Sequence, residues 1–269
     1  MRKNMRKNIL FGLTLAASLA VSPLTFASDS EHGGHNPAAA KAKSPTETIK
    51  AAVAGNDQFK AHHDSHSFDA YQEGQVPNLT VVSCADSRVH TGLFGIDPNN
   101  NIFIIRNIGN QISTAEGSVD YGVRHLPTKI LLIMGHSGCG AVKAAMGNYS
   151  RETEGIKGEL DTLKPVIAKD DGKGEFNERW AKNVERNVDY QVQQALKLYG
   201  DKVKGAEMAV VGAVYDFNDI YGKGRGSLVI TNINGESDPN KIMNDPILKD
   251  LSKAEVVNHV SSRAPAANW

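Results

Sequence analysis

Residues 129–140 read Lys-Ile-Leu-Leu-Ile-Met-Gly-His-Ser-Gly-Cys-Gly, an apolar run that leads directly into a histidine and a cysteine. Two earlier runs, Leu79 to Ser83 and Ile102 to Ile105, are also rich in leucine or β-branched residues and lack a regular alternation. Strands that are buried on both faces of a parallel sheet have this pattern. We therefore predict strands at 79–83, 102–105 and 129–135, in an α/β fold whose central, mostly parallel β-sheet is flanked by helices.

Helical periodicity separates and follows these strands. Apolar residues recur at steps of three and four from Glu175 to Tyr199, which predicts the longest helix there. A glycine-rich turn at 222–226 precedes an expected edge strand at 227–231. Further helices are predicted at 46–60, 113–125 and 141–147, and a fourth strand is predicted at 207–215. Right-handed crossovers between the parallel strands would place helices on both faces of the sheet.

Four side chains that can bind a metal follow the first and third predicted strands. Cys84 and Asp86 come after the first strand, and His136 and Cys139 come after the third. Ligands of open α/β sheets collect beyond the carboxyl ends of the strands, so these groups meet if the two strands are neighbours. Two thiolates, an imidazole and a carboxylate form a complete tetrahedral ligand set for zinc.

A disulfide between Cys84 and Cys139, the two cysteines of the chain, is the alternative. It would be ordinary in an exported protein, because disulfides persist in oxidising compartments. It would not explain why Asp86, Arg88 and His136 flank the cysteines, or why Cys139 has a glycine on each side. Zinc is therefore favoured over a disulfide. A catalytic site is favoured over a structural one, because three ligands plus a carboxylate leave a position that can open.

The N-terminus has the pattern of a secretory signal. Basic residues are concentrated in 1–7, an apolar run covers 9–21, and Thr25-Phe26-Ala27 ends in a small residue that suits cleavage. We predict that residues 1–27 are removed and that the protein is periplasmic, with full secretion as an alternative. The apolar run is too short for a stable membrane span, and an uncleaved anchor is the competing interpretation.

Composition and the remaining segments complete the domain prediction. With 30 basic and 30 acidic residues in 269, the chain has no electrostatic footprint for nucleic acid. Residues 28–45 have no hydrophobic period and predict a flexible linker, before a catalytic domain at 46–235 and an extension at 236–269 that packs on it. Unevenly spaced histidines near the N-terminus are interpreted as solvated side chains: His32, His35, His62, His63 and His66.

The segments around the two cysteines resemble the paired signature of the β-class carbonic anhydrases. These segments are Cys84-Ala85-Asp86-Ser87-Arg88-Val89 and His136-Ser137-Gly138-Cys139-Gly140. Supporting segments match in the expected order at 74–77, 105–110, 118–121 and 211–216, so that the similarity covers roughly residues 46–234. The resemblance implies a β-carbonic anhydrase-like fold and a zinc lyase that interconverts CO2 and bicarbonate. It also implies one zinc ion per subunit and attack of zinc-bound hydroxide on CO2.

Carried over residue by residue, the resemblance makes Cys84, His136 and Cys139 the zinc ligands. Asp86 and Arg88 would form a catalytic pair in which Arg88 orients the carboxylate and Asp86 accepts a hydrogen bond from the hydroxide. Five further residues match the substrate pocket of the family: Gln75, Phe103, Ile108, Tyr121 and Gly140. In the family this pocket is shared across a dimer interface. We therefore expect a homodimer or tetramer with its active site between subunits.

The resemblance also bears on regulation of the site. In some family members the aspartate moves onto zinc at low pH and closes the site, which would make Asp86 a fourth ligand. Members that bicarbonate regulates share a tryptophan three residues before the first cysteine. This chain has Val81 there, although Arg106 matches the arginine of the regulatory site. We therefore expect an Asp86–Arg88 pair in an open zinc site near neutral pH, and no strong inhibition by bicarbonate.

Two other functions compete with CO2 hydration. Some relatives hydrolyse CS2 or COS on the same scaffold, and their first ligand shell does not distinguish them. From a different class, a zinc-binding or disulfide-stapled exported protein would have no catalytic activity. The presence of both Asp86 and Arg88 favours an enzyme.

Overall fold

The computed structural model describes residues 43–262 of the chain. The chain forms two units, Met1–Asp64 and Ser65–Trp269. The predicted signal peptide at 1–27 lies outside the described residues, as do nearly all of the predicted linker and residues 263–269 of the predicted extension.

The first unit contains helix α1, Pro45–Ala61. Ser44 caps this helix, because its side chain accepts a hydrogen bond from the Glu47 N–H while the Glu47 carboxylate accepts one from the Ser44 N–H. This reciprocal capping box satisfies two backbone donors that have no partner inside the helix. The helix therefore begins at Pro45, the last residue of the predicted 28–45 linker.

The apolar side chains of α1 are exposed. In the sequence, Ile49, Val53 and Phe59 lie between polar residues, a pattern that fits a helix packing against another element. All residues of α1 are exposed, these three by 62%, 55% and 44%. The boundary between the two units falls after Asp64, within the predicted catalytic domain at 46–235.

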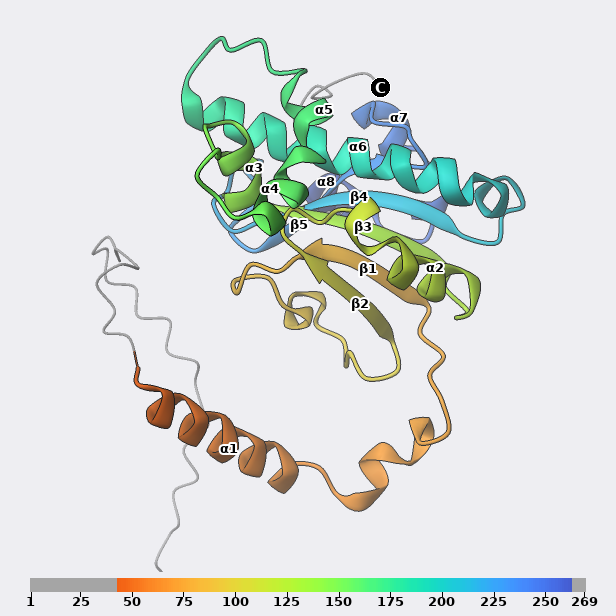
Figure 1. The fold of residues 1–269 in the computed structure, drawn as a ribbon. Helices are drawn as coiled ribbons and strands as arrows, with labels where there is room; N and C mark the ends of the chain where they lie inside the picture. Colours follow the sequence, from red (N-terminus) through yellow and green to blue (C-terminus); the bar gives the residue numbers. More distant parts are fainter. Residues whose placement is uncertain (1–42, 263–269) are drawn as a thin grey trace, which may run out of the picture. The chain divides into compact units, whose positions relative to one another are not determined.

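The second unit is built on a five-stranded sheet with the strand order β2-β1-β3-β4-β5 (Figure 1). Its strands are β1 (Leu79–Cys84), β2 (Ile102–Asn107), β3 (Ile130–His136), β4 (Ala209–Asp216) and β5 (Ser227–Ile233). The first four are parallel, and β5 pairs antiparallel with β4 at the edge. The predicted mostly parallel α/β sheet is confirmed, with strand ends within two residues of the predicted ones.

Most of the predicted helices are present with small changes. Helix α6, Phe176–Lys204, continues beyond its predicted end at Tyr199. The predicted helix at 113–125 is a 3₁₀ turn, η4 (Ser113–Ala115), followed by α2 (Glu116–Arg124). The other elements are η2 (Ser65–Tyr71), η3 (Thr91–Phe94), α3 (Gly140–Ala145), α4 (Glu154–Asp161), α5 (Lys164–Ile167), α7 (Pro239–Met243), η5 (Pro246–Leu248) and α8 (Lys253–His259). Among residues 43–262, none of the helices combines the length and the apolar character of a membrane span.

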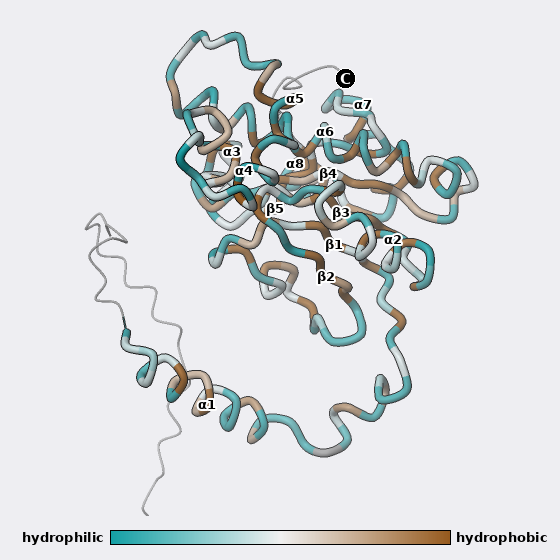
Figure 2. Tube along the Cα trace, in the orientation of Figure 1, coloured by the Kyte–Doolittle hydropathy of each residue, from teal (hydrophilic) through white to brown (hydrophobic). Residues whose placement is uncertain are grey.

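The two faces of the sheet are covered differently. On one face, α2 and α6 share a buried cluster with Val82 and Ile133. Figure 2 shows hydrophobic colour along much of the strands of the sheet. On the other face, Val81 and Leu132 pack against the β1–β2 connection, which contains η3. From β1 to β2 the chain moves toward one edge of the sheet, and from β2 through β3 to β4 it moves toward the other edge. Right-handed crossovers that run in opposite directions lie on opposite faces of the sheet. The expectation of helices on both faces is therefore only partly met, because the β1–β2 connection on the second face contains the short 3₁₀ helix η3 and no α-helix.

Close packing of α6 on the sheet depends on two glycines. A Cβ at Gly135 of β3 would lie 2.7 Å from Val188 Cγ2, and a Cβ at Gly212 of β4 would lie 2.8 Å from Val188 Cγ1. Val188 itself is fully buried. Because real Cβ contacts are longer than this, the missing side chains let α6 approach β3 and β4, directly above the strand that carries His136.

The described part of the C-terminal extension packs on β5. Val260 forms a parallel bridge with Ile230, and the Ser261 N–H donates to the Ile230 carbonyl. A buried apolar cluster joins β5 to α7, η5 and α8 through Ile233, Ile242, Leu248, Val256 and Val260. Residues beyond 235 thus continue the core of the second unit.

We predict that Gly212→Ala lowers the free energy of unfolding by about 1–3 kcal/mol, because the added methyl group overpacks the contact with Val188. Urea denaturation monitored by circular dichroism measures this change. Gly200→Ala is the matched control, because a Cβ at Gly200 of α6 meets no atom within 4 Å. It is expected to stabilise the protein by about 0.5–1 kcal/mol through helix propensity. Equal stability of the two variants would contradict the tight contact.

Candidate metal centre

Three potential metal ligands meet at the carboxyl-terminal edge of the sheet. Cys84 ends β1, His136 ends β3, and Cys139 is the N-cap residue of α3. Their ligand atoms all lie within 4.8 Å of one another, and the three residues are 4%, 0% and 1% exposed. The neighbours β1 and β3 are parallel, so the sheet brings the predicted ligands together as expected.

The histidine has the geometry of a metal ligand. Its Nδ1 lies 3.0 Å from the Ser137 carbonyl oxygen, an acceptor that keeps the proton on Nδ1 and leaves the lone pair on Nε2. His136 Nε2 is fully buried and has no hydrogen-bond partner within the part of the chain that the structure describes. A buried, unpaired acceptor is costly, and a cation between Nε2 and the two sulfur atoms would satisfy it. The donor set therefore fits zinc.

The two thiols influence each other strongly. A hydrogen bond from the Cys139 side chain, together with the nearby His136, lowers the pKa of the Cys84 thiol. The same contact and almost complete burial raise the pKa of Cys139, because a second negative charge beside the first is unfavourable. Neither cysteine forms a disulfide in the structure. A divalent cation would remove the repulsion and allow both thiols to ionise.

Asp86 and Arg88 form a bidentate ion pair beside the ligands. Arg88 Nε and Nη2 donate to Asp86 Oδ1 and Oδ2 at 2.9 and 2.6 Å, and the Arg88 backbone N–H also donates to Oδ1. These bonds hold the pKa of the Asp86 carboxyl well below its usual range. Asp86 Oδ2 lies 3.8 Å from His136 Nε2, so the carboxylate borders the potential metal position.

Several supporting residues were not predicted from the sequence. The Ser137 hydroxyl accepts hydrogen bonds from the N–H groups of Phe217 and Asn218, which ties the ligand loop to the end of β4. Trp180 Nε1 of α6 donates to the Cys139 carbonyl at 2.9 Å. These contacts join residues 41 to 81 positions apart, so no local pattern signals them.

Arg106 also acts on the backbone of this site. Its Nε donates to the Cys84 carbonyl at 3.1 Å, and its Nη2 donates to the Asp86 carbonyl at 2.6 Å. The sequence singled out this arginine as a match to a regulatory position. In the structure it holds the turn that connects a metal ligand to the carboxylate.

The turn between His136 and Cys139 requires Gly138. Its φ is +69°, a left-handed conformation that a side chain disfavours, and an added Cβ would lie 3.3 Å from Asn218 Nδ2. The Gly138 carbonyl accepts a hydrogen bond from Arg88 Nη2 at 3.2 Å. The glycine therefore lets both ligands face the same point and joins their loop to the Asp86–Arg88 pair.

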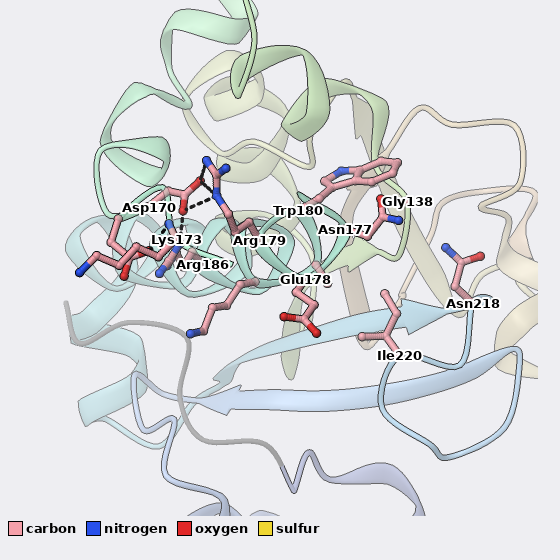
Figure 3. Close-up of a pocket in the computed structure, with 13 residues that line it drawn as sticks. Gly138, Asp170, Lys173, Asn177, Glu178, Arg179, Trp180, Arg186, Asn218 and Ile220 are labelled. Carbon is pink, nitrogen blue, oxygen red and sulfur yellow. Dashed lines mark hydrogen bonds and ion pairs between the residues drawn. The ribbon is translucent and has the colours of Figure 1, made fainter. Parts of the chain in front are cut away.

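A cavity of about 820 Å³ lies behind this loop (Figure 3). Gly138 and Asn218 line one end of it, and Trp180 of α6 lines the middle. At the other end Asp170 pairs with Arg179 at 2.8 Å. Gly138, which lies between His136 and Cys139, therefore borders this cavity.

The five predicted substrate-pocket residues divide into two groups. Ile108 follows β2 and Gly140 follows Cys139, so both lie at the edge with the ligands. Phe103 pairs with Thr80, four residues before Cys84, which places it about 13 Å along the strand from that ligand. Tyr121 packs on Phe103, with ring centroids 5.7 Å apart, and is 47% exposed.

Gln75 belongs to the second group. It precedes β1, and the neighbouring Val76 N–H donates to Asn100 in the loop before β2. Gln75 therefore lies at the opposite edge of the sheet from Cys84, and it is exposed. A single chain brings Ile108 and Gly140 to the ligands but leaves Gln75, Phe103 and Tyr121 away from them.

Comparison with known proteins gives a consistent match. The carbonic anhydrase family model matches residues 79–223. Carbonic anhydrase 2 of Mycobacterium tuberculosis is 28% identical, over 65% of this chain and 90% of the relative. The structure of a Coccomyxa β-carbonic anhydrase in complex with acetazolamide is 27% identical, with a TM-score of 0.55 over 65% of this chain and 83% of that chain. One of two tetrameric β-carbonic anhydrases from Sordaria macrospora is 25% identical, with a TM-score of 0.57 over 63% and 92%.

We predict that metal removal under oxidising conditions becomes progressively irreversible. The two sulfur atoms lie within 4.8 Å of each other, and without a metal ion one of them favours the reactive thiolate. After chelation in air, a thiol-reactive dye should count fewer than two free thiols per unfolded chain, and zinc binding should return only after a reductant is added. A matched sample chelated without oxygen is the control. Full recovery with zinc alone after long exposure to air would contradict the prediction.

Proposed function

Because the chain belongs to the β-carbonic anhydrase family, we propose that Cys84, His136 and Cys139 hold a zinc ion. With this ion the lyase catalyses the reversible hydration of CO2 to bicarbonate and a proton. The observation that carries the proposal is the buried Cys/His/Cys group, in which His136 Nε2 has no hydrogen-bond partner among the described residues. A bound zinc ion acts as a Lewis acid that makes hydroxide available near neutral pH as the nucleophile for CO2.

Asp86 orients the nucleophile in this proposal. Arg88 occupies one side of the carboxylate with two side-chain hydrogen bonds, while Oδ2 faces His136 at 3.8 Å. The lowered pKa of Asp86 keeps the carboxylate ionised, so it can accept a hydrogen bond but does not supply a proton. By accepting the hydrogen bond of the attacking hydroxide, Asp86 would direct a lone pair toward CO2.

The apolar part of the substrate pocket is proposed to come from a second subunit. Phe103 and Tyr121 contact each other on the part of the sheet distant from the Cys84 end, and Tyr121 is half exposed. Gln75 lies at the far edge as well. A homodimer, or a tetramer made of such dimers, would bring these residues to the metal ligands of the neighbouring chain. The Sordaria macrospora enzymes, which share this fold, are tetrameric.

We place the enzyme in the periplasm. The basic, apolar and small-residue segments within 1–27 support export, because this order is that of a cleavable signal. In that compartment bound zinc would also protect Cys84 and Cys139 from oxidation to a disulfide.

We predict that the zinc-loaded protein hydrates CO2 in stopped-flow measurements. Asp86→Asn should lower kcat/KM by about 10²-fold, because the neutral amide accepts a weaker hydrogen bond from the attacking hydroxide than the carboxylate does. Zinc content should stay at one ion per chain in this variant. Cys139→Ala is the matched variant that should lose zinc as well as activity. Turnover of CS2 or COS without CO2 hydration would assign the scaffold to those substrates, and zinc binding without turnover of any of the three would overturn catalysis.

A subunit-complementation experiment tests the shared pocket. One chain carries Cys139→Ala, and its partner carries Gln75→Ala with Tyr121→Ala; the two chains bear different affinity tags. If the pocket is shared, the hybrid dimer contains one site with intact ligands and intact walls, and it should regain up to half of the wild-type activity. Each parental homodimer is the control. A hybrid as inactive as both parents would show that each pocket is built within one chain.

A further inference from the structure

Phe217 lies between a metal ligand and the catalytic arginine. It follows β4 directly, and its N–H donates to the Ser137 hydroxyl at 3.1 Å. Its ring stacks on the His136 ring with centroids 5.6 Å apart and an interplanar angle of 29°. The Arg88 Cζ lies 4.6 Å from the centroid of the same ring. One side chain that the sequence did not single out therefore touches both parts of the site.

Arg88 needs a support of this kind. Its side chain is 54% exposed, and a long exposed arginine has considerable rotamer entropy to lose when it holds a carboxylate in one orientation. Its other contacts besides Asp86 include the Gly138 carbonyl at 3.2 Å. The planar guanidinium stacks well on an aromatic face, and the negative face of the ring attracts its charge.

We propose that Phe217 is a positioning residue for CO2 hydration, which fixes Arg88 and through it the direction in which the Asp86 carboxylate points. The proposal rests on the proposed function, because it assigns Phe217 a role in that reaction. In this proposal Phe217 acts through Arg88 and not on the reacting atoms. Its ring confines the guanidinium from one side while Asp86 binds it along the edge, so that Asp86 Oδ2 stays beside His136.

A purely space-filling role makes a different prediction. The ring also packs edge-on against Tyr215, with centroids 5.6 Å apart, and leucine would preserve much of that apolar contact. Leucine has no aromatic face for Arg88, whereas tyrosine keeps the face and adds a hydroxyl at the ring edge. Phe217→Leu and Phe217→Tyr therefore separate packing from stacking.

The kinetic test compares these variants in stopped-flow CO2 hydration. We expect Phe217→Leu to lower kcat by about three- to tenfold, with little change in KM, zinc content or melting temperature. Phe217→Tyr should retain nearly the wild-type kcat. Phe176→Leu is the control, because Phe176 is 43% exposed at the start of α6 and lies outside the ligand set. In an Arg88→Ala background, Phe217→Leu should cause no further loss.

A second measurement does not depend on turnover. In ¹H–¹⁵N spectra, the Arg88 Nε–H signal, assigned by its loss in Arg88→Lys, should carry the ring-current shift of a proton near an aromatic face. That shift should disappear in Phe217→Leu and persist in Phe217→Tyr. Unchanged kcat in Phe217→Leu, or an equal loss with and without Arg88, would overturn the proposal. Absence of CO2 hydration in the wild-type protein would instead overturn the proposed function, while the Arg88 signal would still report whether the stacking exists.

Discussion

The parallel pairing of β1 with β3 is the constraint on which the rest of the site depends. Its register aligns Ser83 with Met134, so Cys84 lies level with Gly135 and the two strands end one residue apart, at Cys84 and His136. Cys84 and His136 are separated by 52 positions in the sequence, yet their ligand atoms lie within 4.8 Å. A shift of this register by one residue would turn one of the two side chains to the opposite face and separate the ligands.

The short loop from His136 to Cys139 combines several functions in four residues. It supplies two ligands, its Gly138 carbonyl binds Arg88, and its Ser137 hydroxyl binds the backbone after β4. Trp180 of α6 holds the loop from the side of the cavity. Because each contact uses a different strand or helix, the precision of the metal position depends on the packing of the whole second unit.

The sequence was sufficient to predict the strands and the ligands, because the relevant signals are local. A buried parallel strand needs a short apolar run, and Cys84, His136 and Cys139 stand next to such runs. The same reasoning failed for α1, whose Ile49 and Val53 resemble the apolar face of a packed helix but are exposed. Periodicity reveals that a helix has an apolar side, but it does not reveal what covers that side.

The sequence by itself therefore determined the class of fold, the ligand chemistry and the family, since each depends on residue types at short spacing. Only the tertiary structure decided which residues support the site and which predicted pocket residues lie far from it. Phe217 and Trp180 reach the ligand loop through the sheet and α6, and Phe103 is held away from Cys84 by the register of β2 with β1. Such contacts arise from the packing of distant segments, and no spacing within the chain encodes them locally.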